Sequence, residues 1–272
     1  MEYRCETTSL TGFVQQLAAN ILPHGYWFYV RGYVPEGKDP RAVDQKLLVK
    51  YGINISRQQR ARRKLAGQAN LHYLRWERDW VLLATKGEHK FFAEEGTSIR
   101  DARHIPIQVG GYSLRVARGQ FLKKEDGEIV ATPDSRYRVR VQIARETHRD
   151  IRGHLLSLAC HRSPENLAQE FWRIPFEPYA PIRRQLLNLL RLMNQERQSA
   201  GFEKLSPKLL RYKRQIVQPF LTKDDHFYEP DCQRGWQNHA SVLAIAECPS
   251  GSADVGGQKM RFDGASNLRG IR

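Results

Sequence analysis

The chain has 272 residues and a formal net charge of +15, from 44 Lys and Arg against 29 Asp and Glu. With 40% hydrophobic and 10% aromatic residues it can bury a core, which excludes disorder along its whole length. No apolar run approaches the ~18 residues of a membrane-spanning helix, so we expect no membrane partner. The positive excess lies in residues 51–217, which contain 32 Lys and Arg against 17 Asp and Glu. This charge predicts an anionic partner, and nucleic acid is the one we favour.

Cysteine spacing indicates the cellular compartment. Cys5, Cys160, Cys232 and Cys248 are far apart and form no CxxC pair, so they predict reduced thiols rather than a disulfide framework. Together with the polar N-terminus MEYRCETTSL, this predicts a cytoplasmic protein, associated with the nucleoid if it binds DNA. The sequence has neither a Walker loop nor a GxGxxG turn, so we expect no cofactor.

The N-terminal part begins with a predicted helix and a predicted strand. In residues 10–22, apolar side chains recur every fourth position from Phe13 to Ile21, as on one face of a helix. Residues 26–34, YWFYVRGYV, are aromatic and β-branched, which is typical of a strand.

Two further helices are predicted from their end signals. Asp39 and Pro40 form a preferred helix start, and Gly52 ends that helix. Ser56, with Gln59 three residues later, forms a capping box that starts the next helix, which runs to about residue 67.

Residues 71–76 and 80–85 predict two strands joined by a short hairpin at residues 77–79. The resulting order, helix, strand, helix, helix, strand, strand, resembles that of winged-helix domains over residues 9–87. The resemblance implies a helix-turn-helix whose second helix enters the major groove, and a hairpin wing that rests on the DNA backbone. The strand at residues 26–34 is longer than the strand usually found at that position in winged-helix domains.

From residue 105 the pattern changes to strands with one solvent-exposed face, followed by helices. Residues 112–118 and 137–144 alternate apolar and polar residues and predict two strands joined by a charged connection. The polar face of this pair carries Arg115, Arg138 and Arg140. Helices are predicted at residues 151–161, 163–172 and 182–200, with a fourth from residue 206.

Together these elements predict an α+β fold in three parts. The winged-helix-like domain occupies residues 1–98, and the basic β-hairpin and helical domain occupies residues 99–222. Residues 223–272 are rich in Gly and small polar residues and predict a mostly disordered C-terminal tail.

The stretch from Arg57 to Lys64 contains five cations in eight residues, and no acid occurs between Arg57 and Trp76. In a helix only Ala61 and Leu65 would form an apolar seam, which is the composition expected of a helix that docks narrowly and contacts DNA with its other sides. The alternative is an exposed helix whose charges only keep the protein in solution. The predicted nucleic-acid-binding residues combine this helix, the wing and the basic hairpin: Arg57, Arg60, Arg62, Arg63, Lys64, Arg75, Arg78, Arg115, Arg138 and Arg140.

The strand at residues 26–34 allows a second interpretation. Trp27, Tyr29, Arg31 and Tyr33 share one face, as do the aromatic residues of sheets that stack unpaired RNA bases. Aromatic residues buried in a sheet that is covered on both sides give the same pattern, and we favour the core.

Two patterns suggest catalysis or metal binding. Asp79, Glu88 and Lys90 have the residue types of the D…ExK arrangement of metal-dependent nucleases, in which carboxylates hold Mg²⁺. The triplet that contains Glu88 and Lys90 is predicted to be a loop rather than a strand, which disfavours the match. Three histidines between His148 and His161 are spaced by six and seven residues, whereas neighbouring zinc ligands on a helix are four apart, so we expect no metal site.

The sequence therefore predicts a non-enzymatic DNA-binding protein that grips duplex DNA with a basic recognition helix and a wing. A transcription regulator and an accessory protein of plasmid or mobile-element replication or maintenance fit this prediction equally. A homodimer also fits it, since winged-helix proteins often bind as pairs. The first alternative is a structured-RNA-binding or RNA-processing factor, and the second is an Mg²⁺-dependent nuclease.

Overall fold

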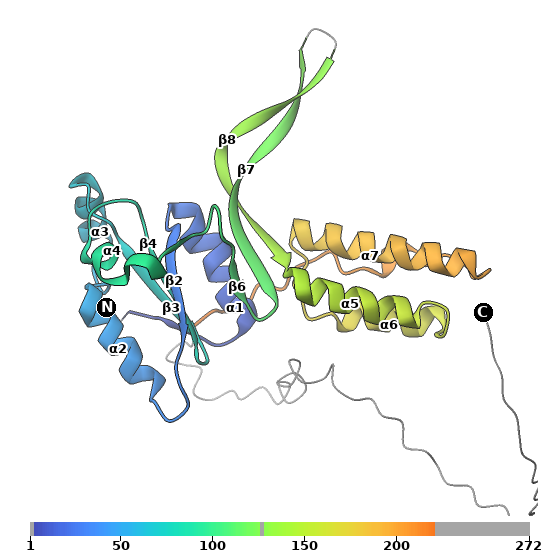
Figure 1. Cartoon of the computed structure of the whole chain (residues 1–272), viewed down its shortest axis with the longest axis horizontal. Helices are drawn as coiled ribbons and strands as arrows, with labels where there is room; N and C mark the ends of the chain where they lie inside the picture. Colours follow the sequence, from blue (N-terminus) through green and yellow to red (C-terminus); the bar gives the residue numbers. More distant parts are fainter. Residues whose placement is uncertain (1–2, 126–127, 221–272) are drawn as a thin grey trace, which may run out of the picture. The chain divides into compact units, whose positions relative to one another are not determined.

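The computed structural model describes residues 3–125 and 128–220 of the chain. Within these residues the fold is mixed α+β, with seven α-helices and two sheets, which confirms the predicted class (Figure 1). The described residues belong to one compact unit, Met1–Lys223. The predicted disordered tail, residues 223–272, lies outside the described residues.

The first sheet has five strands in the order β1-β3-β4-β2-β5. β3 and β4 form an antiparallel hairpin, β2 pairs antiparallel with β4, and β1 runs parallel to β3. The tight turn of the hairpin places Glu77 at a φ of 51°. The predicted strands at residues 26–34, 71–76 and 80–85 are all confirmed as members of this sheet. Its strands span Glu6–Thr7 (β1), Phe28–Tyr33 (β2), Leu71–Trp76 (β3), Asp79–Ala84 (β4) and Arg100–Asp101 (β5).

Helices cover both faces of this sheet. Leu82 and Leu83 are neighbours in β4 and therefore point to opposite faces. Leu83 packs in one hydrophobic cluster with Phe13 of the N-terminal helix, whereas Leu82 packs in another with Tyr51 of α2. The helices involved are α1 (Leu10–Gln15), continued by a π turn (Gln16–Ile21), α2 (Pro40–Tyr51) and α4 (Lys90–Glu95).

The element order predicted for residues 9–87 is present, but a winged-helix arrangement is not confirmed. The helices of a winged-helix domain pack together on one side of its sheet. Here α1 and α2 contribute to different clusters on opposite faces. The sheet is thus the central layer of this part of the chain.

Local signals fix α3 (Arg57–Leu65), as the sequence predicts. The Ser56 hydroxyl accepts a hydrogen bond from Gln59 N at 3.2 Å, and the Gln59 side chain accepts one from Ser56 N at 2.8 Å. This confirms the capping box. None of the side chains of α3 is buried, so core packing contributes little to the stability of the helix.

We expect Ser56→Ala to destabilise α3 by about 1 kcal/mol, because it removes the cap from a helix with little other support. Amide hydrogen exchange within α3 should become roughly fivefold faster, while exchange in β3 and β4 stays the same. Ser56→Thr keeps the hydroxyl and serves as the control. Unchanged exchange in the alanine variant would show that other contacts hold α3.

The second sheet has the order β6-β7-β8 and is dominated by one long antiparallel hairpin. Its strands are β6 (Ile107–Val109), β7 (Tyr112–Glu125) and β8 (Glu128–Ile143). The two strands predicted at residues 112–118 and 137–144 are confirmed, but the charged connection predicted between them was wrong, because backbone pairing continues from Tyr112 and Ile143 out to Glu125 and Glu128. That stretch is rich in charged residues and therefore resembles a loop in the sequence, although its backbone is extended. Figure 1 shows the outer half of the hairpin extending away from the helices.

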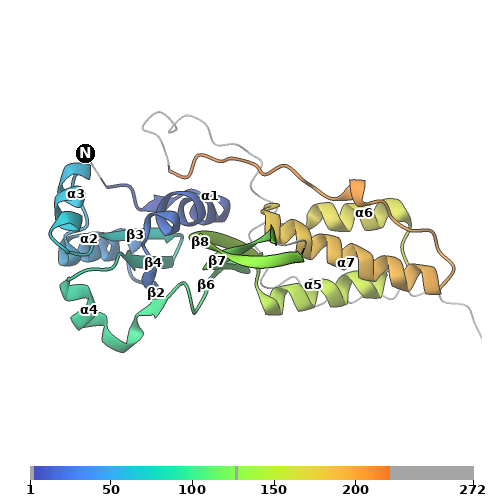
Figure 2. The same cartoon turned by 90° about the horizontal axis from the view of Figure 1, so that it is seen from above.

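Three helices follow the hairpin and lie side by side (Figures 1 and 2). They are α5 (Arg145–Leu158), α6 (Pro164–Arg173) and α7 (Ala180–Ser199), close to the predicted ranges. The fourth predicted helix is wrong: only Pro207–Leu209 form a short 3-10 turn. None of the helices among the described residues combines the length and the apolar character needed to cross a bilayer.

The residues after that 3-10 turn form an irregular strap that returns to the N-terminal helix. Thr8 N donates to Pro219 O at 3.0 Å, and the Gln15 side chain donates to Val217 O at 3.1 Å. The larger hydrophobic cluster likewise contains side chains from both sides of the predicted boundary after residue 98, such as Leu17 and Leu190.

Candidate nucleic-acid interface

Arginine side chains, rather than an apolar seam, attach α3 to the rest of the fold. Arg60 donates to the carbonyl oxygens of Ile53 at 3.0 Å and Leu71 at 2.9 Å, and to the Tyr26 hydroxyl at 3.2 Å. Arg63 donates to Gly52 O at 3.4 Å. The two guanidinium groups thus bind the backbone segments that flank α3, and they anchor the helix to the rest of the fold.

The predicted apolar seam of α3 is wrong. Ala61 is exposed, and Leu65 is 90% exposed. The outward face also carries three exposed cations, Arg57, Arg62 and Lys64, and no ion pair between described residues includes them. The five cations predicted as one group therefore divide into two anchors and three residues that face solvent.

Arg75 is not part of any surface. Its side chain is 2% exposed and forms an ion pair with Asp44 of α2 at 2.9 Å, with Glu6 as a second acid at 3.2 Å. The prediction that Arg75 contacts nucleic acid from the wing was therefore wrong, because the alternation of β3 turns this side chain toward α2. Arg78, at the hairpin turn, is half-buried and donates to the carbonyl oxygens of Val34 and Pro35.

The arginines of the long hairpin are brought together as predicted. Arg115 of β7 is paired directly with Arg140 of β8, and Ala117 with Arg138, so the three guanidinium groups leave one face of the sheet. All three are exposed. Arg138 also forms a surface ion pair with Asp134 at 2.8 Å, and Arg115 Nε donates to Arg103 O at 3.1 Å.

The aromatic face of β2 belongs mostly to the core, the interpretation favoured from the sequence. Tyr29 is fully buried, and its hydroxyl donates to Pro106 O at 3.0 Å. Tyr33 is exposed at the strand end. Tyr29 therefore cannot stack on an RNA base while the sheet is intact, which removes the main support for RNA binding by this strand.

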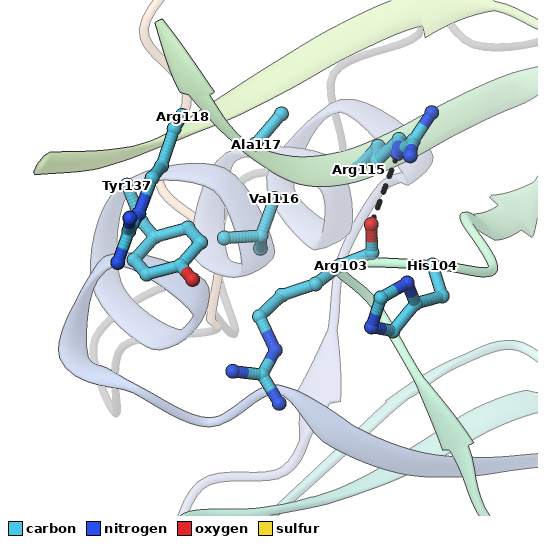
Figure 3. A pocket seen from close by; sticks show the side chains of 7 residues that line it. All are labelled: Arg103, His104, Arg115, Val116, Ala117, Arg118 and Tyr137. Atoms are coloured by element: carbon cyan, nitrogen blue, oxygen red, sulfur yellow. Dashed lines mark hydrogen bonds between the residues drawn. The ribbon is translucent and has the colours of Figure 1, made fainter. Parts of the chain in front are cut away.

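A pocket that the sequence did not suggest lies along β7 where its pairing with β6 ends. The β6–β7 pairing reaches Leu114, and beyond it Val116 N donates to Ala102 O. The pocket has a volume of about 310 Å³ (Figure 3). We call it the β7-edge pocket; it is lined by Arg103, His104, Arg115, Val116, Ala117, Arg118 and Tyr137.

Three lining residues of this pocket, Arg103, Arg118 and Tyr137, are joined with Trp27 in a run of cations and aromatic rings. The Arg118 guanidinium lies 4.9 Å from the centre of the Tyr137 ring, which lies 4.7 Å from that of Trp27. The Arg103 guanidinium lies 4.7 Å from the centre of the Trp27 ring. The only signal for this pocket in the sequence is Arg118, a charged residue at a position where the alternation of β7 would place an apolar one.

His72 lies beside the anchor of α3. Burial and the nearby charge of Arg60 lower the pKa of His72 to about 4. Its Nδ1 is hydrogen-bonded to the Tyr3 hydroxyl, and its ring contacts those of Tyr3 and Tyr26. A neutral imidazole is thus part of the packing that holds α3.

The residues of the suggested nuclease arrangement lie apart. Asp79 begins β4, and at about 3.3 Å per residue it is roughly 17 Å from the strand end at Ala84, beyond which Glu88 and Lys90 follow. Of the three histidines considered for a zinc site, His154 pairs with Glu170 at 3.2 Å. Among the described residues, no group of three or more His, Cys, Asp or Glu side chains is arranged to hold a metal ion.

No protein-family model matches this chain, and no curated protein matches it either. The candidate function therefore depends on the geometry and chemistry described above.

Proposed function

We propose that this protein binds duplex nucleic acid, with DNA as the preferred form, through the outward face of α3. The observation that carries the proposal is the division of the cations of this helix. Because Arg60 and Arg63 hold α3 by backbone carbonyl groups, Arg57, Arg62 and Lys64 extend from it into solvent. A helix with free cations and no acid of its own is suited to phosphate contacts and to guanine edges.

The other predicted contacts fit this proposal as supporting elements. In it α3 takes the place of a recognition helix, and the β3–β4 hairpin with Arg78 takes that of a wing, as the element order suggests. The exposed face with Arg115, Arg138 and Arg140 extends the phosphate contacts. A transcription regulator and a replication or maintenance accessory of a plasmid or mobile element both use such binding, and a homodimer on a two-fold site is compatible with it.

The test is a salt series of duplex DNA binding, followed by fluorescence anisotropy, for the wild type and the triple variant Arg57→Ala/Arg62→Ala/Lys64→Ala. All three side chains are exposed, so the fold should be retained. The slope of log K against log salt should decrease by about 0.9 for each phosphate that the variant no longer neutralises, or about 2.7 in total.

The matched control is Lys38→Ala/Lys46→Ala/Arg191→Ala, which removes the same charge from exposed positions outside α3, in the loop before α2, in α2 and in α7. It should change the slope much less. Equal effects of the two triple variants would mean that the protein attracts DNA only through its net charge, and the proposal would fail. Including folded RNA and an assay for Mg²⁺-dependent cleavage distinguishes the two alternative functions.

A further inference from the structure

The β7-edge pocket has the size and the lining of a ligand site, contains no residue of α3, and shares only Arg115 with the basic face of the hairpin. Its volume of about 310 Å³ falls at the lower end of pockets that enclose small molecules. Three of its seven lining residues are arginines and one is a histidine, and none is an acid. The pocket is therefore suited to an anion.

The arginines of the pocket are suited to phosphate in particular. A guanidinium presents a planar set of donors that matches two oxygens of a phosphate, which a lysine cannot do. Asp101 holds Arg103 in position at 2.6 Å, and the guanidinium lies over the Trp27 ring at 4.7 Å from its centre. Arg118 is exposed, and its guanidinium lies over the Tyr137 ring.

The remaining lining is apolar and aromatic. Figure 3 shows the Val116 side chain between Tyr137 on one side and His104 on the other, with the Arg103 guanidinium below. Val116 is almost fully buried, so it borders the pocket from the core side and offers a ligand little surface. A planar ring next to an arginine cluster is the combination by which proteins hold an unpaired base and its phosphate together.

We propose that the β7-edge pocket binds one unpaired nucleotide of a nucleic-acid strand. Arg103 and Arg118, with His104, contact the phosphate, and Tyr137 contacts the base. The pocket is too small for a base pair, so this site recognises a strand that is open at that position. The proposal goes beyond duplex binding by α3 and does not depend on it.

The test uses a fluorescently labelled ten-residue oligothymidylate and measures its anisotropy with the full chain. Arg118→Ala should weaken binding roughly tenfold, because it removes a charge-assisted hydrogen bond from an exposed side chain. The control is Arg136→Ala, which removes an exposed arginine from the same hairpin outside the pocket and should have less than a twofold effect. Equal reductions in affinity in the two variants would overturn the proposal.

A second variant tests the base contact. Tyr137→Leu should weaken binding at least fivefold, while Tyr137→Phe, which keeps the ring, should stay within twofold of the wild type. Thymidine monophosphate should displace the oligonucleotide at lower concentration than inorganic phosphate does. Equal competition by the two would show a bare anion site and overturn the assignment of a nucleotide.

The outcome is separable from that of the duplex proposal. The duplex for this comparison has 20 base pairs, or about two helical turns. Pocket variants should bind it with an affinity within twofold of the wild type. The α3 triple variant should weaken duplex binding and leave oligothymidylate binding intact. An oligouridylate of the same length, run in parallel, shows whether the strand is DNA or RNA.

Discussion

Replacing Asp44 by alanine is expected to lower the free energy of unfolding by about 3–5 kcal/mol. Asp44 accepts hydrogen bonds from Arg75 Nε at 2.9 Å and Nη2 at 2.9 Å, and from the Tyr73 hydroxyl at 2.7 Å. Arg75 is 2% exposed, so the variant leaves a guanidinium in the interior without its main partner. The remaining acid, Glu6, is half-exposed and compensates only in part.

Urea unfolding at neutral pH measures this decrease in stability. The double variant Asp44→Leu/Arg75→Met removes both charges and should lose less stability than Asp44→Ala, since no buried charge is left unpaired. Asp134→Ala is the control, because it breaks a pair whose arginine is 70% exposed, and it should cost less than about 1 kcal/mol. A decrease in Asp44→Ala no larger than that of the control would contradict the assigned role of the buried pair.

The buried Asp44–Arg75 pair and the contacts of Arg60 stabilise the same region, in which α2, α3 and β3 meet. Asp44 and Arg75 fix α2 to β3. Arg60 binds Ile53 O, just after α2, and Leu71 O, at the start of β3. The position of α3, and with it the direction of its free cations, therefore depends on charged groups that are not available to a ligand.

Helix starts and ends were predictable because their signals are local. Asp39 accepts a hydrogen bond from Arg41 N at 3.0 Å, and Gly52 ends α2 with a φ of 55°, a conformation that glycine adopts readily. The capping box of Ser56 works in the same way, within three residues. Strand pairing in the outer hairpin could not be predicted from the sequence, since it depends on residues that face each other from two strands rather than on neighbours in the chain.

The roles of the arginines were not predictable from charge alone. Arg60, Arg62 and Arg75 look alike in sequence, yet the first binds backbone carbonyl groups, the second is exposed and the third is buried. The difference lies in partners that are distant in the chain, such as Leu71, 11 positions from Arg60, and Asp44, 31 positions from Arg75. The β7-edge pocket was missed for the same reason, because Trp27 and Tyr137 meet only after the two sheets have packed.

Acidification from pH 6.5 to 4 is expected to cost about 3 kcal/mol of stability through His72 alone. The folded pKa of this imidazole is about 4, below the usual 6.5, because of burial and then the charge of Arg60. In this interval the unfolded chain binds a proton that the folded chain does not, so stability falls as the pH falls, by about 1.4 kcal/mol for each pH unit. Above pH 6.5 His72 is neutral in both states, and this contribution is complete.

His72→Gln tests this expectation, since glutamine stays neutral and can still form a hydrogen bond with the Tyr3 hydroxyl. Urea unfolding of both proteins at pH 7, 6, 5 and 4, which spans that interval, gives the difference in their pH dependence. His89 and His148, whose pKa values burial also lowers, are present in both proteins and cancel in this difference. The wild type should lose stability more steeply below pH 6.5, and parallel curves would mean that His72 can accept its proton without disturbing the packing around Arg60.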